Sequence, residues 1–126
     1  MAESSKGARI GFWVLTALVG LSQLASGTAE VAGVAEAIEG FTHLGYPAYL
    51  GYIIGPAKIA GALTLLVPRM PRLKEWAYAG FVFDFAGAFL SHLYHGDGAK
   101  ELAAPLVALA MLMGSYALRP ADRRLG

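Results

Sequence analysis

Four long apolar runs alternate along the chain with short polar segments. None of them shows the two-residue alternation of a strand, and all are rich in small and aliphatic residues. The runs cover residues 10–29, 50–67, 76–94 and 102–118. Each is close to the roughly 17–25 residues that a helix needs to cross a bilayer. We therefore predict an all-α membrane protein, a single domain over residues 1–126 in which four transmembrane helices form an up-down bundle.

The segment between the first and second runs, residues 30–49, predicts a short helix along the membrane surface. Its apolar residues recur at helical spacing, and Glu36 and Glu39 fall outside the apolar stripe. We expect this interfacial helix to end near Gly40, before a turn at residues 44–47 leads into the second span.

Composition and charge support this class and orient the chain. Hydrophobic residues make up 56% of the 126 residues, and the mean hydropathy is +0.52, which is too apolar for an ordinary soluble domain. Eight of the ten Lys and Arg residues precede the first run, separate the second from the third, or follow the fourth. Basic connections face the cytoplasm, so we predict cytoplasmic termini and the lipid bilayer as the main partner. The formal net charge of +1 gives no indication of a nucleic-acid partner.

The chain has no cysteine, so its own residues cannot carry thiol redox chemistry. Its first apolar run follows Lys6 and Arg9 and ends near small residues, as a signal peptide would. Removing that run would leave three spans and disturb the charge pattern. We expect it to be retained as the first span.

Two ionisable residues, Lys58 and Asp84, interrupt the second and third runs at equal distances from the basic turn at residues 68–72. In antiparallel helices both would lie at the same depth near the middle of the membrane, at about 1.5 Å rise per residue. A lone charge there costs at least ~2.5–3.5 kcal/mol on insertion scales, so we expect a buried Lys58–Asp84 ion pair. Glycines on both helices should allow the close approach that this pair requires: Gly51, Gly55, Gly80 and Gly87.

Polar residues form one stripe on the third run and another on the first. The third run carries Asp84, Ser91 and His92 and continues the stripe at His95; the first carries Thr16, Gln23 and Ser26 and continues it at Glu30. Exposing such groups to hydrocarbon is costly, so both stripes should face inward. Because Glu30 and His95 fall near the outer surface, the stripes predict a polar cleft that opens outward and ends at the buried pair. The candidate catalytic residues are Asp84, Lys58 and His92, and the candidate binding residues are Gln23, Glu30, Ser91 and His95.

Two structural alternatives stay open. The Lys58–Asp84 pair could serve only to fix the register of two helices. The histidines could be hydrogen-bonded lining, because the spacing of His43, His92 and His95 does not specify a metal site. No metal ligand is predicted.

Several segments form a recognisable pattern over most of the chain. They are LGYP at residues 44–47, GPAKIAGAL at 55–63, PRMPRLKEWAYAGF at 68–81, FDFAGA at 83–88 and SHL at 91–93. With these segments the chain resembles the DoxX-like family of small bacterial membrane proteins, over roughly residues 8–118. The resemblance implies a four-helix protein of the bacterial inner membrane and marks Lys58, Asp84, Ser91 and His92 as motif positions. Tyr78, within the same pattern, is a further candidate binding residue.

The residues and the resemblance together leave three functions open, and the resemblance supports mainly the first. The wider family includes a small subunit of a thiosulfate:quinone oxidoreductase, a component of a membrane oxidoreductase complex, and distant receptor-assembly chaperones. We therefore expect an oxidoreductase-associated subunit that holds a quinone or similar small amphiphile above Lys58 and Asp84, with His92 and Glu30 passing protons outward. One alternative is a non-catalytic assembly factor or scaffold that binds another membrane protein or itself. The other is a small membrane enzyme that uses Asp84 as acid and base on a lipid.

Overall fold

The computed structural model describes residues 5–125, which are helical throughout, with no strand in this range. The elements are α1 (Lys6–Ala32), α2 (Ala35–His43), α3 (Leu50–Leu66), α4 (Pro71–His95), α5 (Ala99–Ala117) and a short 3₁₀ helix, η1 (Ala121–Arg123). The all-helical prediction is confirmed, and each predicted span corresponds to one of the four long helices.

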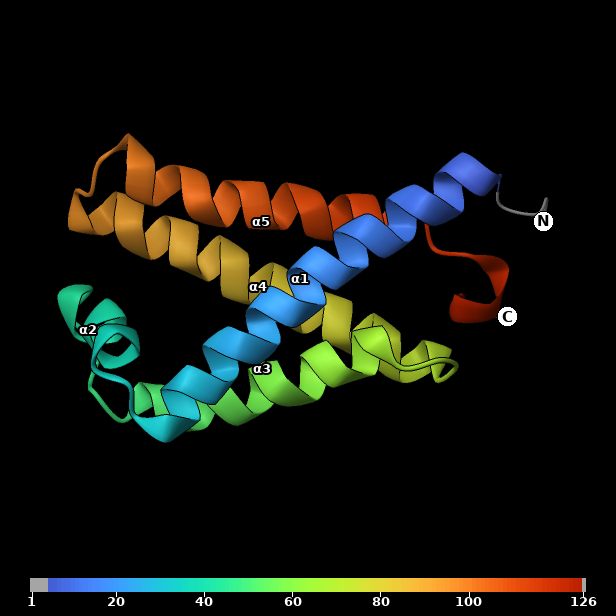
Figure 1. Cartoon of the computed structure of the whole chain (residues 1–126). Helices are drawn as coiled ribbons and strands as arrows, with labels where there is room; N and C mark the ends of the chain where they lie inside the picture. Colours follow the sequence, from blue (N-terminus) through green and yellow to red (C-terminus); the bar gives the residue numbers. More distant parts are fainter. Residues whose placement is uncertain (1–4, 126) are drawn as a thin grey trace.

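The four long helices run antiparallel in chain order, so that α1 begins and α5 ends at the same end of the molecule (Figure 1). Helix α1 packs against α3 and α5, and α4 packs against α5 and α3. Helices α3 and α4 lie close where a short turn joins them and diverge toward the opposite end, where α2 lies (Figure 1). We call the end with the α3–α4 turn the inner end and the end with α2 the outer end.

Local sequence explains where α1 begins and ends. The Ser5 hydroxyl caps the start of the helix by accepting a hydrogen bond from the Ala8 N–H at 3.0 Å. Gly33 ends it in the left-handed conformation (φ 72°), and the next N–H returns to the Ala29 carbonyl. Helix α1 therefore runs beyond residue 29, the predicted end of the first span. Glu30, which we expected in the interfacial helix, lies in the last turn of α1, and the separate short helix α2 starts only at Ala35.

Glycines determine which helices approach most closely. We predicted that they would bring the second span against the third (α3 against α4), but the closest glycine contact lies elsewhere. Gly27 on α1 and Gly55 on α3 face each other: a Cβ at Gly27 would lie 2.7 Å from the Gly55 carbonyl oxygen. Gly51 also faces α1, against Glu30. Gly80 has open space around its Cβ position. Gly51 and Gly55 thus pack α3 against α1, and Gly61 is the α3 glycine that faces α4, at Phe81.

The core lies toward the inner half of the bundle, with Leu65, Phe81 and Leu112 among its buried residues. A buried hydrogen-bonded chain crosses it. The Ser115 hydroxyl lies 2.6 Å from the Thr16 hydroxyl and 2.7 Å from the Tyr78 hydroxyl. These bonds connect α1, α4 and α5, and they satisfy polar groups that would be costly to bury alone.

One helix among the described residues, α1, is both long and apolar enough to cross a membrane on the criteria of length and composition. Helix α3 is apolar but shorter, with 17 residues.

Candidate functional site

Lys58 lies at the centre of a small buried polar group between α1 and α3. Its ammonium donates hydrogen bonds to Glu30 Oε2 at 2.7 Å and to the Ser26 hydroxyl at 3.1 Å. Glu30 is only 5% exposed, and the Lys58 side chain is 13% exposed. The other Glu30 oxygen, Oε1, is buried and has no hydrogen-bond partner among the described residues. The group is therefore a buried ion pair with one unused acceptor.

This pairing corrects the predicted one. We predicted that Lys58 pairs with Asp84 and that Glu30 lies near the outer surface. In the structure Lys58 binds Glu30, and the part of the chain described here contains no ion pair within 4.0 Å between Lys58 and Asp84. The cause is the close contact of Gly27 with Gly55, which brings the last turn of α1 beside Lys58.

Asp84 and Lys58 nevertheless line one cavity, between α3 and α4. Its volume is about 600 Å³, and its lining is apolar apart from Lys58, Thr64 and Asp84. Asp84 is partly buried and lies within electrostatic range of Lys58 and Glu30. Its carboxylate forms no hydrogen bond with another described side chain. A positive donor and a free acceptor thus face the same apolar space.

The cavity extends in a different direction from the predicted cleft. Its other lining residues include Leu73, Trp76 and Phe83, so it runs from Lys58 and Asp84 toward the inner end, along the α3–α4 face. Trp76 and Phe83 are 69% and 78% exposed, so this face is open at the side. Lys58 and Asp84 thus line a lateral, mainly apolar cavity, while the predicted residues Ser91 and His95 line a separate cavity of about 540 Å³ at the outer end.

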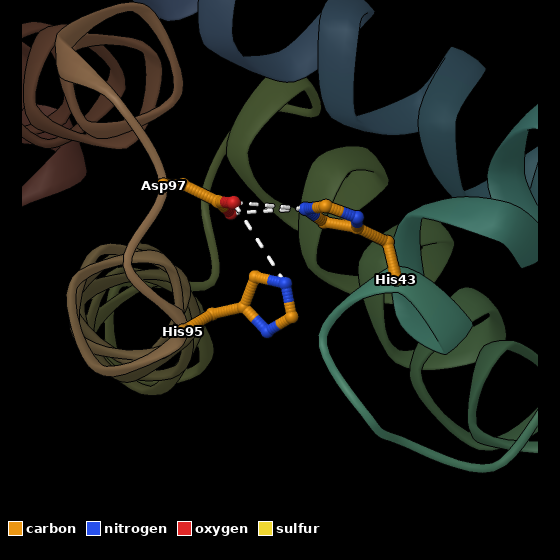
Figure 2. A group of neighbouring side chains, drawn as sticks. All are labelled: His43, His95 and Asp97. Atoms are coloured by element: carbon orange, nitrogen blue, oxygen red, sulfur yellow. Dashed lines mark hydrogen bonds and ion pairs between the residues drawn. The ribbon is translucent and has the colours of Figure 1, made fainter.

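The predicted residues Ser91, His92 and His95 lie at the outer end of α4, outside the lining of the lateral cavity. The Ser91 hydroxyl lies 2.6 Å from the Tyr46 hydroxyl. His92 Nδ1 lies 2.6 Å from Asp97 Oδ2, and His95 lies beside the same carboxylate. Figure 2 shows the Asp97 carboxylate pointing toward His43, with the His95 ring beside both of them. The bonds from His92 and then His43 hold the pKa of the Asp97 carboxyl below its usual value, despite partial burial.

Two other predicted binding residues lie apart from the Lys58 group. Tyr78 is buried in the core and hydrogen-bonded to Ser115, so its hydroxyl is already used. Gln23, on α1, is partly buried, and its Oε1 atom is buried without a partner among the described residues.

A sequence model of the DoxX-like family matches residues 14–115. The chain belongs to the DoxX-like family. No curated protein and no solved structure matches it. Membership of this family indicates a membrane protein. The match contains every residue of the Lys58 group, the lateral cavity and the histidine cluster.

The inner end of this DoxX-like protein holds two buried cations that the sequence analysis counted only as topological charges. Lys74, 1% exposed, donates hydrogen bonds to the carbonyls of Thr64 and Val67. The Arg123 guanidinium donates to the carbonyls of Leu65 and Val67. Both cations therefore cap the carboxyl end of α3, where the helix leaves carbonyls unpaired and the helix dipole is negative.

Lys74 makes the stability of this DoxX-like protein depend on pH. It precedes the predicted span at residues 76–94. Burial, and then the neighbouring Arg123, lower its pKa from 10.5 to about 8, while Asp122 acts in the opposite direction. Between these values the unfolded chain keeps a proton that the folded chain releases. The free energy of unfolding should therefore rise with pH from about 8 to 10.5.

Chemical unfolding of the protein in detergent micelles, with Lys74→Met beside the wild type, measures this effect. Other groups titrate in both proteins, so the difference between the two profiles isolates Lys74. That difference should change across the stated window and be flat below it. Parallel profiles would contradict the prediction.

Proposed function

We propose that this DoxX-like protein crosses the bacterial inner membrane four times and holds a small amphiphile, such as a quinone, in the lateral cavity between α3 and α4. The observation that carries the proposal is the cavity itself: about 600 Å³, apolar, with Lys58 and Asp84 at its outer end. This volume lies within the roughly 300–1,000 Å³ of ligand pockets, which are mostly apolar with a few polar groups that orient the ligand.

The two charged residues suit a molecule that presents a carbonyl in its oxidised form and a hydroxyl in its reduced form. A lysine ammonium has three N–H donors, and Lys58 uses two of them on Glu30 and Ser26. The third can donate to a ligand carbonyl. The Asp84 carboxylate has no side-chain hydrogen-bond partner among the described residues. It can therefore accept a hydrogen bond from a ligand hydroxyl and can take its proton. A quinone and its quinol present these two groups.

The open side of the cavity fits a ligand that arrives from the bilayer. Trp76 and Phe83 are exposed beside it, where lipid tails would contact a spanning helix. An isoprenoid tail could extend through this side while the ring lies near Lys58. Association with a membrane oxidoreductase follows from the family resemblance alone, and self-assembly or a scaffold role is the competing function.

Trp76 provides the test of binding, because the chain has only one other tryptophan, Trp13. In a Trp13→Phe background, Trp76 fluorescence is followed while a short-chain ubiquinone or menaquinone analogue is added to the protein in nanodiscs. We expect saturable quenching in the wild-type cavity and roughly 10-fold weaker binding in Asp84→Asn, which corresponds to the loss of one hydrogen bond to a charged group. Asp84→Asn is the preferred variant because Asp84 forms no side-chain hydrogen bond and no ion pair within 4.0 Å among the described residues.

A matched control, Lys100→Met, changes an exposed charge at the start of α5 that does not line the cavity, and it should leave quenching unchanged. Quenching that rises linearly with quinone and is the same in all variants would show only partition into the bilayer. That result would contradict the binding function and favour the scaffold.

A further inference from the structure

All three histidines of the chain gather around one carboxylate at the outer end. His43 comes from the end of α2, His92 and His95 come from the last turn of α4, and Asp97 follows in the α4–α5 turn. His43 Nε2 lies 3.0 Å from Asp97 Oδ1, and His95 Nε2 lies 3.9 Å from the same oxygen. The spacing of the histidines along the chain does not indicate this cluster, because His43 is distant in sequence from His92 and His95. The position of α2 brings it beside them.

We propose that His43, His95 and Asp97 bind a divalent transition-metal ion of the zinc class. One ligand atom from each residue lies within 4.8 Å of the other two. With bonds of about 2.0–2.2 Å, a tetrahedral zinc ion holds its ligand atoms roughly 3.3 Å apart. The His43–Asp97 distance already fits, and only His95 must move inward. Two imidazoles and a carboxylate form a known zinc donor set that leaves a fourth position for water.

His92 has a separate part in this site: it positions the carboxylate. Its Nδ1 atom lies 2.6 Å from Asp97 Oδ2, which leaves Oδ1, the oxygen nearest both His43 and His95, directed toward the ion. Partners of this kind orient metal ligands and typically change metal affinity by about 10–100-fold when removed.

Hydrogen bonding alone does not explain the cluster. His43 and His92 already satisfy the carboxylate, and His95, at 3.9 Å, is too distant to form a hydrogen bond with it. His95 nevertheless lies with its ring centroid 4.5 Å from that of His43, so both imidazoles are held beside one oxygen (Figure 2). The side chains of His43 and His95 are 49% and 40% exposed, so an ion can enter from solvent.

A bound ion would connect α2 to the α4–α5 turn. It would thereby hold α2 in place across the diverging ends of α3 and α4. This inference does not depend on the proposed quinone function, because the cluster contributes no residue to the lateral cavity.

The experiment uses the full chain without a polyhistidine tag, in detergent micelles. Zn²⁺ is titrated in competition with a chromogenic chelator, and Co²⁺ is added separately to record the visible absorption of a tetrahedral site. We expect one ion per chain. His95→Gln, His43→Gln and Asp97→Asn should each lose more than the roughly 10–100-fold expected for His92→Gln. Glu39→Gln, an exposed change on α2 outside the cluster, should bind as the wild type does.

His95→Gln is the decisive variant, because His95 forms no side-chain hydrogen bond among residues 5–125 that the substitution would remove. Circular dichroism verifies that each variant is folded. Absence of stoichiometric Zn²⁺ binding by the wild-type chain, or equal affinity in folded His95→Gln, would overturn the proposal.

Discussion

Lys58→Met should lower the free energy of unfolding by about 3–5 kcal/mol, the usual cost of removing one partner from a buried ion pair. The substitution leaves the Glu30 carboxylate 5% exposed, with neither of its oxygens bonded to a cation. The Ser26 hydroxyl, 3.3 Å from Glu30 Oε2, can replace only part of the lost interaction. Unfolding by denaturant in detergent micelles measures the change.

A second substitution separates charge from packing. In the double variant Lys58→Met with Glu30→Gln, no charge is left unpaired, and replacing a buried pair with neutral groups is often close to neutral for stability. We therefore expect the double variant to be more stable than Lys58→Met alone. A double variant that is less stable than both single variants would show that the pair is not the source of the effect.

Asp84→Asn provides the contrast that distinguishes the observed pairing from the predicted one. Asp84 forms no ion pair within 4.0 Å with Lys58 in the described chain, so its neutralisation should change stability far less than Glu30→Gln does. A large loss in Asp84→Asn together with a small one in Glu30→Gln would instead favour the pairing expected from the sequence.

The helices could be predicted from the sequence because each is a long apolar run, and length and periodicity are properties of a single segment. Lys58 could also be assigned to the interior, because a charge in such a run needs a partner. Its partner could not be assigned. Spacing from the α3–α4 turn gives the depth of a residue, but not the direction that it faces around the helix axis. Gly27 and Gly55 determine that direction by bringing α1 against α3.

Contacts between separate segments could not be predicted from the sequence at either end of the bundle. The histidine cluster depends on where α2 lies, and a nine-residue helix has no sequence signal that gives its position. At the inner end, Lys74 and Arg123 fit the excess of basic residues that predicts the cytoplasmic side. That explanation is sufficient for the sequence, so it does not point to their additional role as caps of α3. The structure also places Arg69 and Met70 of the α3–α4 turn at positive φ, which is uncommon for residues other than glycine and was not indicated by the sequence.

The close contact of α1 with α3 therefore predicts opposite effects for two similar substitutions. Gly27→Ala should destabilise the protein by about 1–3 kcal/mol, because the new Cβ would lie 2.7 Å from the Gly55 carbonyl oxygen and 2.9 Å from Lys58 Cβ. Gly80→Ala meets nothing within 4 Å. It should stabilise by roughly 0.5–1 kcal/mol, because alanine is the better helix former.

The structural consequence of Gly27→Ala can be measured separately from stability. Since the chain has no cysteine, Leu21→Cys and Ile53→Cys, both exposed positions, can carry the only two spin labels on α1 and α3. We expect the label distance to increase in Gly27→Ala and to stay unchanged in Gly80→Ala. Because α1 carries Glu30, any such separation also weakens the bond to Lys58, so Gly27→Ala should reduce the additional loss caused by Lys58→Met. Full additivity of the two substitutions would mean that the glycine contact and the ion pair are independent, and that Gly27 does not control the pairing of Lys58.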